Sequence, residues 1–264
     1  MARAWPWSSR VRARGEPGSG NGASSFHLGW RIDQTEPLVE VSAVLEVVVP
    51  PAVDRLYFWA LQVSFLDGAR NRGAAHVGLQ WNRNHPGGGA VNWGGYAAGG
   101  GLLPGSASPL PSTPNDPNTR DYPWQPGRPY RLRVAGAPGA PGRWQAEVTD
   151  LRAGRSAVIR SLTAGGDRLG SPTVWSEVFA RCEHPSVTVR WSGLEARTAD
   201  GRTVRPTALS VSYEAHAAGG CDNTTTAADE QGILQVTNTK RSVRQGAVIP
   251  PPLGPSPAAA SPSA

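Results

Sequence analysis

Apolar and polar residues alternate with a period of two along most of this chain. Between residues 54 and 67, Tyr57, Trp59, Leu61, Val63 and Phe65 are apolar, and the positions between them are mixed in character. A β-strand turns successive side chains to opposite faces, so this pattern predicts a strand with one face buried. Residues 37–50 are rich in β-branched side chains and end at a pair of prolines, which predicts another strand followed by a turn.

Similar segments follow along the chain, separated by turns rich in Gly and Pro. The further predicted strands span residues 74–82, 90–96, 130–135, 143–151, 156–162, 173–182, 186–191, 208–213 and 233–237. This spacing is typical of antiparallel sandwiches and barrels. We therefore expect an all-β protein, an antiparallel β-sandwich of the jelly-roll or concanavalin-like kind.

We expect one folded domain, at residues 29–239 of the 264. Residues 1–28 lack periodicity and are rich in Arg, Gly and Ser, which predicts a loose lead-in. Residues 240–264 begin with Lys240 and then become rich in Pro, Ala and Ser, a composition that predicts a disordered tail. Residues 97–123 form an insertion much longer than a usual connection, and such loops are often functional.

The formal net charge of +6 comes almost entirely from arginine, since Lys240 is the single lysine. The arginines are scattered, whereas a phosphate-binding surface gathers them on one face, so we expect no specific binding of nucleic acid. No stretch reaches the roughly 18 apolar residues that a membrane span requires. No signal peptide is visible in this chain, and secretion would require a start that lies upstream. The oligomeric state is left open.

Cys182 and Cys221 are the only cysteines. Two residues so far apart do not form a zinc framework. They either pair as a disulfide, which would stabilise the fold by roughly 3 to 4 kcal/mol and indicate an oxidising compartment, or remain two buried thiols.

Aromatic and amide side chains gather between residues 76 and 96. Tryptophan rings stack on the C–H faces of sugars, and amide groups hydrogen-bond to sugar hydroxyls, which makes these side chains candidates for carbohydrate binding. The alternative is that Trp81 and Trp93 belong to the core. The candidate ligand-binding residues are Gln80, Trp81, Asn82, Asn92, Trp93 and Tyr96.

Catalysis by paired carboxylates is a second hypothesis, in which Glu177 acts with Glu147 or Asp150, as in glycoside hydrolysis. Glu147 and Asp150 are an odd number of positions apart, so they point to opposite faces of one regular strand. Isolated carboxylates more often form ion pairs with arginines, and no nucleophile elbow or phosphate-binding loop is present. We therefore assign no catalytic residue.

A metal site is not expected either. The five histidines, at positions 27, 76, 85, 184 and 216, have no metal-ligand spacing. The oxygen-rich segment 219–226 is compatible with calcium, but turns in which Asp222 and Asn223 bond to their own backbone explain it better. We expect no cofactor.

Three short motifs carry a resemblance to a known class of fold. They are Tyr-Phe-Trp-Ala at residues 57–60, Val-Gly-Leu-Gln at 77–80 and Val-Asn-Trp-Gly at 91–94. In this first half, the chain resembles uncharacterised bacterial β-sandwich domains similar to concanavalin-like and laminin-G-like modules. The resemblance implies the fold, and sugar binding only by analogy.

The sequence therefore favours a β-sandwich binding module, with a glycan as the expected ligand. Two alternatives stay open. One is an enzyme resembling a glycoside hydrolase that uses Glu177 with Glu147 or Asp150. The other is a structural or interaction domain that its tail tethers to a partner.

Overall fold

The structure, a computed structural model, describes residues 24–113 and 116–252. Within them it contains 16 β-strands and two short 3₁₀ turns, η1 (Pro86–Gly88) and η2 (His216–Ala218). No helix in these residues has the length and apolar character needed to cross a membrane. The strand pairs are antiparallel, so the predicted all-β antiparallel fold is confirmed.

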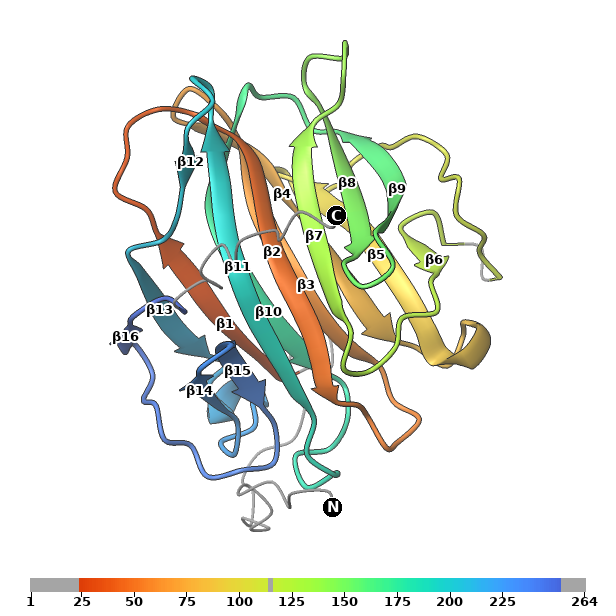
Figure 1. The fold of residues 1–264 in the computed structure, drawn as a ribbon, viewed down its shortest axis with the longest axis vertical. Coiled ribbons are helices and arrows are strands. Elements are labelled where there is room, and N and C mark those ends of the chain that lie inside the picture. Colours follow the sequence, from red (N-terminus) through yellow and green to blue (C-terminus); the bar gives the residue numbers. More distant parts are fainter. Residues whose placement is uncertain (1–23, 114–115, 253–264) are drawn as a thin grey trace, which may run out of the picture.

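The strands form two layers, and the layer nearer the viewer in Figure 1 is called the front sheet here. The front sheet has the order β14 (Thr225–Asp229), β15 (Gly232–Val236), β11 (Thr188–Thr198), β2 (Leu38–Val49), β7 (Pro129–Gly136), β8 (Arg143–Asp150) and β9 (Arg155–Thr163). The short strand β12 (Thr203–Val204) lies beside the second half of β11.

The back sheet has the order β16 (Val248–Ile249), β13 (Ala208–Tyr213), β1 (Ser24–Arg31), β10 (Arg168–Val178), β3 (Tyr57–Asp67), β4 (Arg70–Trp81), β5 (Gly89–Ala97) and β6 (Thr119–Asp121). A single residue pair, Leu169 with Leu38, joins β10 to β2 and so links the two layers.

The core lies between the sheets and is built by the predicted alternation. On β3 the odd-numbered side chains from Tyr57 to Phe65 belong to the core, and Trp59 is 1% exposed. Trp93 on β5 and Trp191 on β11 are fully buried in the same core. Aromatic side chains from both layers thus supply much of the apolar surface that stabilises the sandwich.

The described parts of the long insertion, residues 97–113 and 116–123, pack along one edge of the sandwich. Its Leu103 N–H donates to the Gly95 carbonyl in the back sheet, and its Pro104 carbonyl accepts from Thr163 in the front sheet. The insertion therefore bridges the two layers and ends in β6.

Order extends beyond the predicted domain limits at both ends. Strand β1 begins at Ser24, inside the predicted lead-in, and residues 1–23 lie outside the described residues. At the other end, β16 pairs with β13, which differs from the predicted boundary at residue 239. Composition alone does not indicate this, because the order depends on contacts with distant strands. Residues 253–264 also lie outside the described residues.

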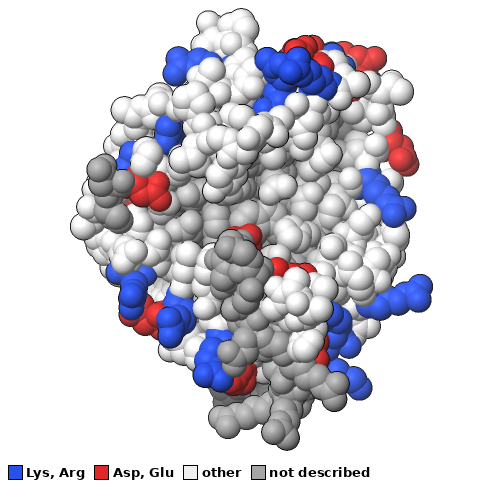
Figure 2. Space-filling model, turned by 180° about the vertical axis from the view of Figure 1, so that it is seen from behind, with Lys and Arg blue, Asp and Glu red and all other residues white. Residues whose placement is uncertain are grey.

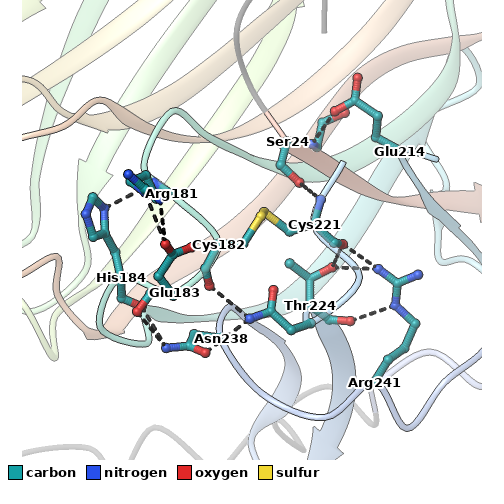
Figure 3. The surroundings of a disulfide bond; sticks show 12 residues. Ser24, Arg181, Cys182, Glu183, His184, Glu214, Cys221, Thr224, Asn238 and Arg241 are labelled. Carbon is teal, nitrogen blue, oxygen red and sulfur yellow. Dashed lines mark hydrogen bonds and ion pairs between the residues drawn. A yellow bond between two sulfur atoms is a disulfide. The ribbon is translucent and has the colours of Figure 1, made fainter. Parts of the chain in front are cut away.

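Cys182 and Cys221 form a disulfide with an S–S distance of 2.02 Å, the pairing that the sequence left open (Figure 3). It joins the segment after β10 to the segment before β14. The Arg241 guanidinium reinforces this junction, because it donates to the carbonyls of Cys221 and Thr224 and lies 3.9 Å from the centre of the Tyr213 ring. Arg241 therefore has a fixed place in the structure, although the sequence predicts that it belongs to a disordered tail.

Candidate functional site

The outer face of the back sheet carries the most distinctive group of side chains. Residues paired across antiparallel strands point to the same face, so the strand register identifies the residues of this face. Its middle row crosses six strands and contains His27, Trp175, Ala60, Gly78, Asn92 and Thr119. We call this surface the Trp175 face.

A small apolar cluster lies on this face, outside the main core. Phe58, Ala60 and Trp175 are 5%, 0% and 3% exposed and form a cluster of their own. The Phe58 and Trp175 rings meet edge to face with centroids 4.9 Å apart, and His76 contacts both rings at 5.3 and 5.4 Å. Such edge-to-face pairs add stability beyond the area they bury and fix the orientation of the rings.

Two histidines border this cluster, and both are electrically neutral at neutral pH. Burial lowers the pKa of His76 to about 4 and also lowers the pKa of His27, whose ring lies 6.1 Å from Trp175. A neutral imidazole offers one hydrogen-bond donor and one acceptor. The two rings therefore present polar groups without charge.

The floor between these side chains is formed by small residues. A Cβ atom at Gly78 would collide with the Trp59 carbonyl and would lie 2.7 Å from the Ala60 Cα, so this position requires glycine. A Cβ at Gly94, on the next strand, would lie 2.8 Å from the side chain of Asn118. Glycine at these positions therefore allows β3 to pack against β4 and the Asn118 side chain to pack against β5.

Two buried polar atoms in the middle row have no hydrogen-bond partner among the described residues, Trp175 Nε1 and Asn92 Oδ1. The Asn92 amide nitrogen is satisfied, because it donates to Thr119 Oγ1 at 2.9 Å. Leaving a buried polar atom unpaired costs about 1 to 3 kcal/mol. Both atoms are enclosed by the surrounding side chains, so this cost is a feature of the packing of the face.

Charge is sparse on this face. Figure 2 shows the basic side chains mainly around its margin, with a few acidic atoms nearer the middle. Between β1 and β5, the middle row and the rows on either side of it contain no Lys or Arg and one carboxylate, Glu177. At the margin, Asp121 bonds to His85 Nδ1 at 2.6 Å, and Glu214 accepts the backbone N–H of Ser25. The described residues contain no cluster of His, Cys, Asp and Glu suited to a metal ion.

The structure separates the six sequence-predicted ligand residues into two groups. Gln80, Asn92 and Tyr96 lie on the Trp175 face, and Asn82, just after β4, donates from its side chain to the Gln80 side chain at 3.1 Å. Trp81 and Trp93 point toward the core instead. Trp93 is 0% exposed, and the Trp81 indole N–H donates to the carbonyl of Val53.

The carboxylates of the hydrolase hypothesis do not come together. Glu177 is on β10 in the back sheet, whereas Glu147 and Asp150 are on β8 in the front sheet. Asp150 accepts hydrogen bonds from Arg128 and from the backbone N–H groups of Arg152 and Ala153, which gives it a structural role in the turn after β8. This arrangement excludes the proposed pairing of Glu177 with either residue.

The sequence missed several residues of the Trp175 face, above all His27, Phe58, Gln62 and Thr173. Gln62 on β3 lies between Thr173 and His76 in the row next to the middle one. The sequence does indicate that Phe58 and Gln62 share a face, because both occupy even-numbered positions of the alternating segment 54–67, opposite the apolar odd-numbered positions. The residues that neighbour this face lie on strands distant in sequence, and periodicity does not identify which strands pair.

Comparison with solved structures gives distant similarities only. The chain is similar to a scytalido-glutamic peptidase, with 10% identity over 82% of this chain and 98% of that one and a TM-score of 0.45. It is also similar to SCP-B, a member of the eqolisin family of peptidases, with 11% identity over 81% of this chain and 98% of that one and a TM-score of 0.41. For tailspike protein 2 of the Escherichia coli O157:H7 bacteriophage CAB120, the values are 13% identity, 72% of this chain, 21% of that one and a TM-score of 0.30. No protein-family model matches the chain, and no curated protein sequence is significantly similar to it.

Proposed function

We propose that the protein is a binding module that holds a neutral glycan on the Trp175 face. The observation that carries this proposal is the chemistry of the three central rows between β1 and β5. They combine amide, hydroxyl and neutral imidazole groups with a single carboxylate and no basic side chain. A surface of this kind offers many hydrogen bonds and little attraction for polyanions.

The polar groups of the face match the needs of sugar hydroxyls, each of which both donates and accepts hydrogen bonds. The Gln62 amide and the His76 imidazole lie side by side on β3 and β4, and each offers both kinds of group. Ala60 and Gly78 are buried beside these groups and let the larger side chains of the face pack closely.

An exposed aromatic ring lies at the edge of this surface. Tyr96 follows Gly94 on the same face of β5, pairs with Ala74 and is 56% exposed. An exposed tyrosine ring offers the amphipathic face on which sugars stack. The rings of Phe58 and Trp175 are enclosed and are therefore not stacking platforms. This arrangement replaces the predicted role of Trp81 and Trp93 as the stacking residues.

The same arrangement favours binding over glycoside hydrolysis. Hydrolysis of a glycosidic bond generally uses two carboxyl groups that flank it. Among the described residues, the central rows contain only one carboxylate, that of Glu177.

Retention of the purified protein on insoluble polysaccharides, followed by a glycan array, tests the proposal. The informative variant is Gln62→Ala, and its control is Gln145→Ala, which makes the same change on the outer face of β8 in the front sheet. Loss of one or two hydrogen bonds predicts binding about tenfold weaker for Gln62→Ala and unchanged for Gln145→Ala. Failure to retain the wild type on any neutral glycan, or equal binding by both variants, would contradict the proposal.

A further inference from the structure

A separate cavity of about 440 Å³ lies at the sandwich edge, beyond β6. Its walls come from the end of the long insertion, the segment that crosses from β6 to β7, and the turn between β8 and β9. Ligand cavities in proteins commonly have volumes of roughly 300 to 1,000 Å³, so the space suits a small molecule. The cavity shares only Asp121 with the margin of the Trp175 face.

Two tyrosines form the aromatic wall of this cavity. The rings of Tyr122 and Tyr130 meet edge to face with centroids 5.9 Å apart. The Tyr130 hydroxyl accepts the backbone N–H of Gln125 at 2.9 Å. The Tyr122 hydroxyl has no hydrogen-bond partner within residues 24–113 and 116–252, so it remains available to a ligand.

Four charged side chains line the cavity, two aspartates and two arginines, and they differ in how they are paired. Asp150 is compensated by Arg128 at 2.9 Å and by two backbone N–H groups, and Asp121 is held by His85 at the margin. Arg155 also lines the cavity and is exposed, and it forms no ion pair with any residue that the structure describes. Arg155 is therefore the one arginine of the lining that has no ion pair among the described residues.

The unpaired guanidinium lies within electrostatic reach of the unpaired hydroxyl. Burial, followed by the Tyr130 and Asp150 charges, raises the pKa of Tyr122 to about 12, and the charge of Arg155 acts in the opposite direction. Tyr122 is thus protonated at neutral pH and can donate a hydrogen bond. A guanidinium beside a hydroxyl donor is the arrangement that binds a carboxylate.

We propose that this cavity binds a small organic carboxylate whose body is about the size of one ring. Its carboxylate pairs with Arg155 and accepts a hydrogen bond from Tyr122. Its body packs against the apolar surfaces of Pro111, Pro123 and Ala157, which line the same space. An acidic sugar and an aromatic acid both fit this description, and titration with one compound of each kind shows which of them binds.

Isothermal titration of the full chain with glucuronate, benzoate and glucose tests the proposal. We expect saturable binding of at least one of the two carboxylates and binding of glucose weaker by about tenfold or more, because glucose lacks the charged group. The preferred carboxylate identifies the body as a sugar or an aromatic ring. Equal affinity for glucose, or saturable binding of neither carboxylate, would overturn the proposal.

Variants locate the binding at this cavity. Arg155→Gln should weaken carboxylate binding about tenfold, and Tyr122→Phe, which keeps the ring and removes the donor, should weaken it by a smaller factor. Arg131→Gln is the control, because it removes the same charge from an exposed position on β7 outside the cavity. Equal affinity of Arg155→Gln and Arg131→Gln would contradict the assignment. All these variants alter side chains at or near the surface, and circular dichroism checks that they fold.

Discussion

The imidazole of His76 meets the indole of Trp175 edge to face, with ring centroids 5.4 Å apart and planes inclined at 71°. The two residues are on β4 and β10, which are not neighbours, because β3 runs between them. The residue of β3 beneath the rings is Ala60, which pairs with both Gly78 on β4 and Trp175 on β10. The small side chain of Ala60 packs in the same buried cluster as Trp175.

The stability of the protein should fall on mild acidification because of His76. The pKa of His76 is about 4 in the folded state and 6.5 when unperturbed, so the unfolded state binds more protons between these values. The free energy of unfolding therefore falls as the pH drops from 6.5 toward 4, by about 3 kcal/mol from this group. Denaturant unfolding at a series of pH values measures the slope.

His76→Gln is the control for this acid sensitivity. The variant removes the titrating group and keeps a polar side chain, so its unfolding free energy should depend less steeply on pH in that range. Some dependence should remain, since burial also lowers the pKa of His27. Identical slopes for the wild type and the variant would contradict the contribution assigned to His76.

Enlarging Ala60 should disrupt the contact between the two rings. Ala60→Val places extra methyl groups where the rings of His76 and Trp175 meet, and overpacking of this kind costs about 1 to 3 kcal/mol. Ser64→Val lies on the same face of β3, two rows away and half-buried, and should cost less. Chemical denaturation of the two variants compares them, and equal stabilities would show that Ala60 does not limit the packing.

Replacement of the two aromatic residues of β5 should have unequal effects. Trp93 is 0% exposed in the core, so Trp93→Ala should lower the unfolding free energy by about 3 to 5 kcal/mol. Tyr96 is 56% exposed, and Tyr96→Ala should change it by about 0.5 kcal/mol or less. Thermal and denaturant unfolding check the difference, and a mild effect of Trp93→Ala would contradict its place in the core.

Loss of the disulfide should destabilise the C-terminal part of the domain. Cys182 and Cys221 are separated by 39 positions, and closure of a loop of that length stabilises a fold by about 4 kcal/mol in the chain-entropy model. The double variant Cys182→Ser, Cys221→Ser should therefore unfold at a lower denaturant concentration. Addition of a reductant should shift the wild type in the same direction and leave the double variant unchanged.

The sequence pattern predicted the fold class and the inward face of the strands. In segment 54–67 the odd-numbered positions are consistently apolar, and they form the buried face of β3. The same rule places both tryptophans on the apolar faces of their strands. Trp81 alternates with Val77 and Leu79, and Trp93 alternates with Val91. Their direction toward the core was thus predictable, but their suitability for stacking on sugars led to the other interpretation.

The composition of the Trp175 face was not predictable, because it depends on strand order. Trp175 and His27 meet only because β1 and β10 are neighbours in the back sheet, and periodicity does not specify which strands pair. The extent of the domain is a similar case. Arg241 lies in a segment of disordered composition, yet its guanidinium binds carbonyl groups of a distant turn.

The most direct test of the central claim is an NMR titration of the imidazole signals with a neutral glycan that the protein retains. The chain has five histidines, of which His27 and His76 lie on the Trp175 face and His216 lies on the turn η2. Single His→Gln variants assign the signals. We predict that the signals of His27 and His76 shift together, with one dissociation constant, while that of His216 stays in place. Binding that leaves the His27 and His76 signals unmoved would contradict the proposed site.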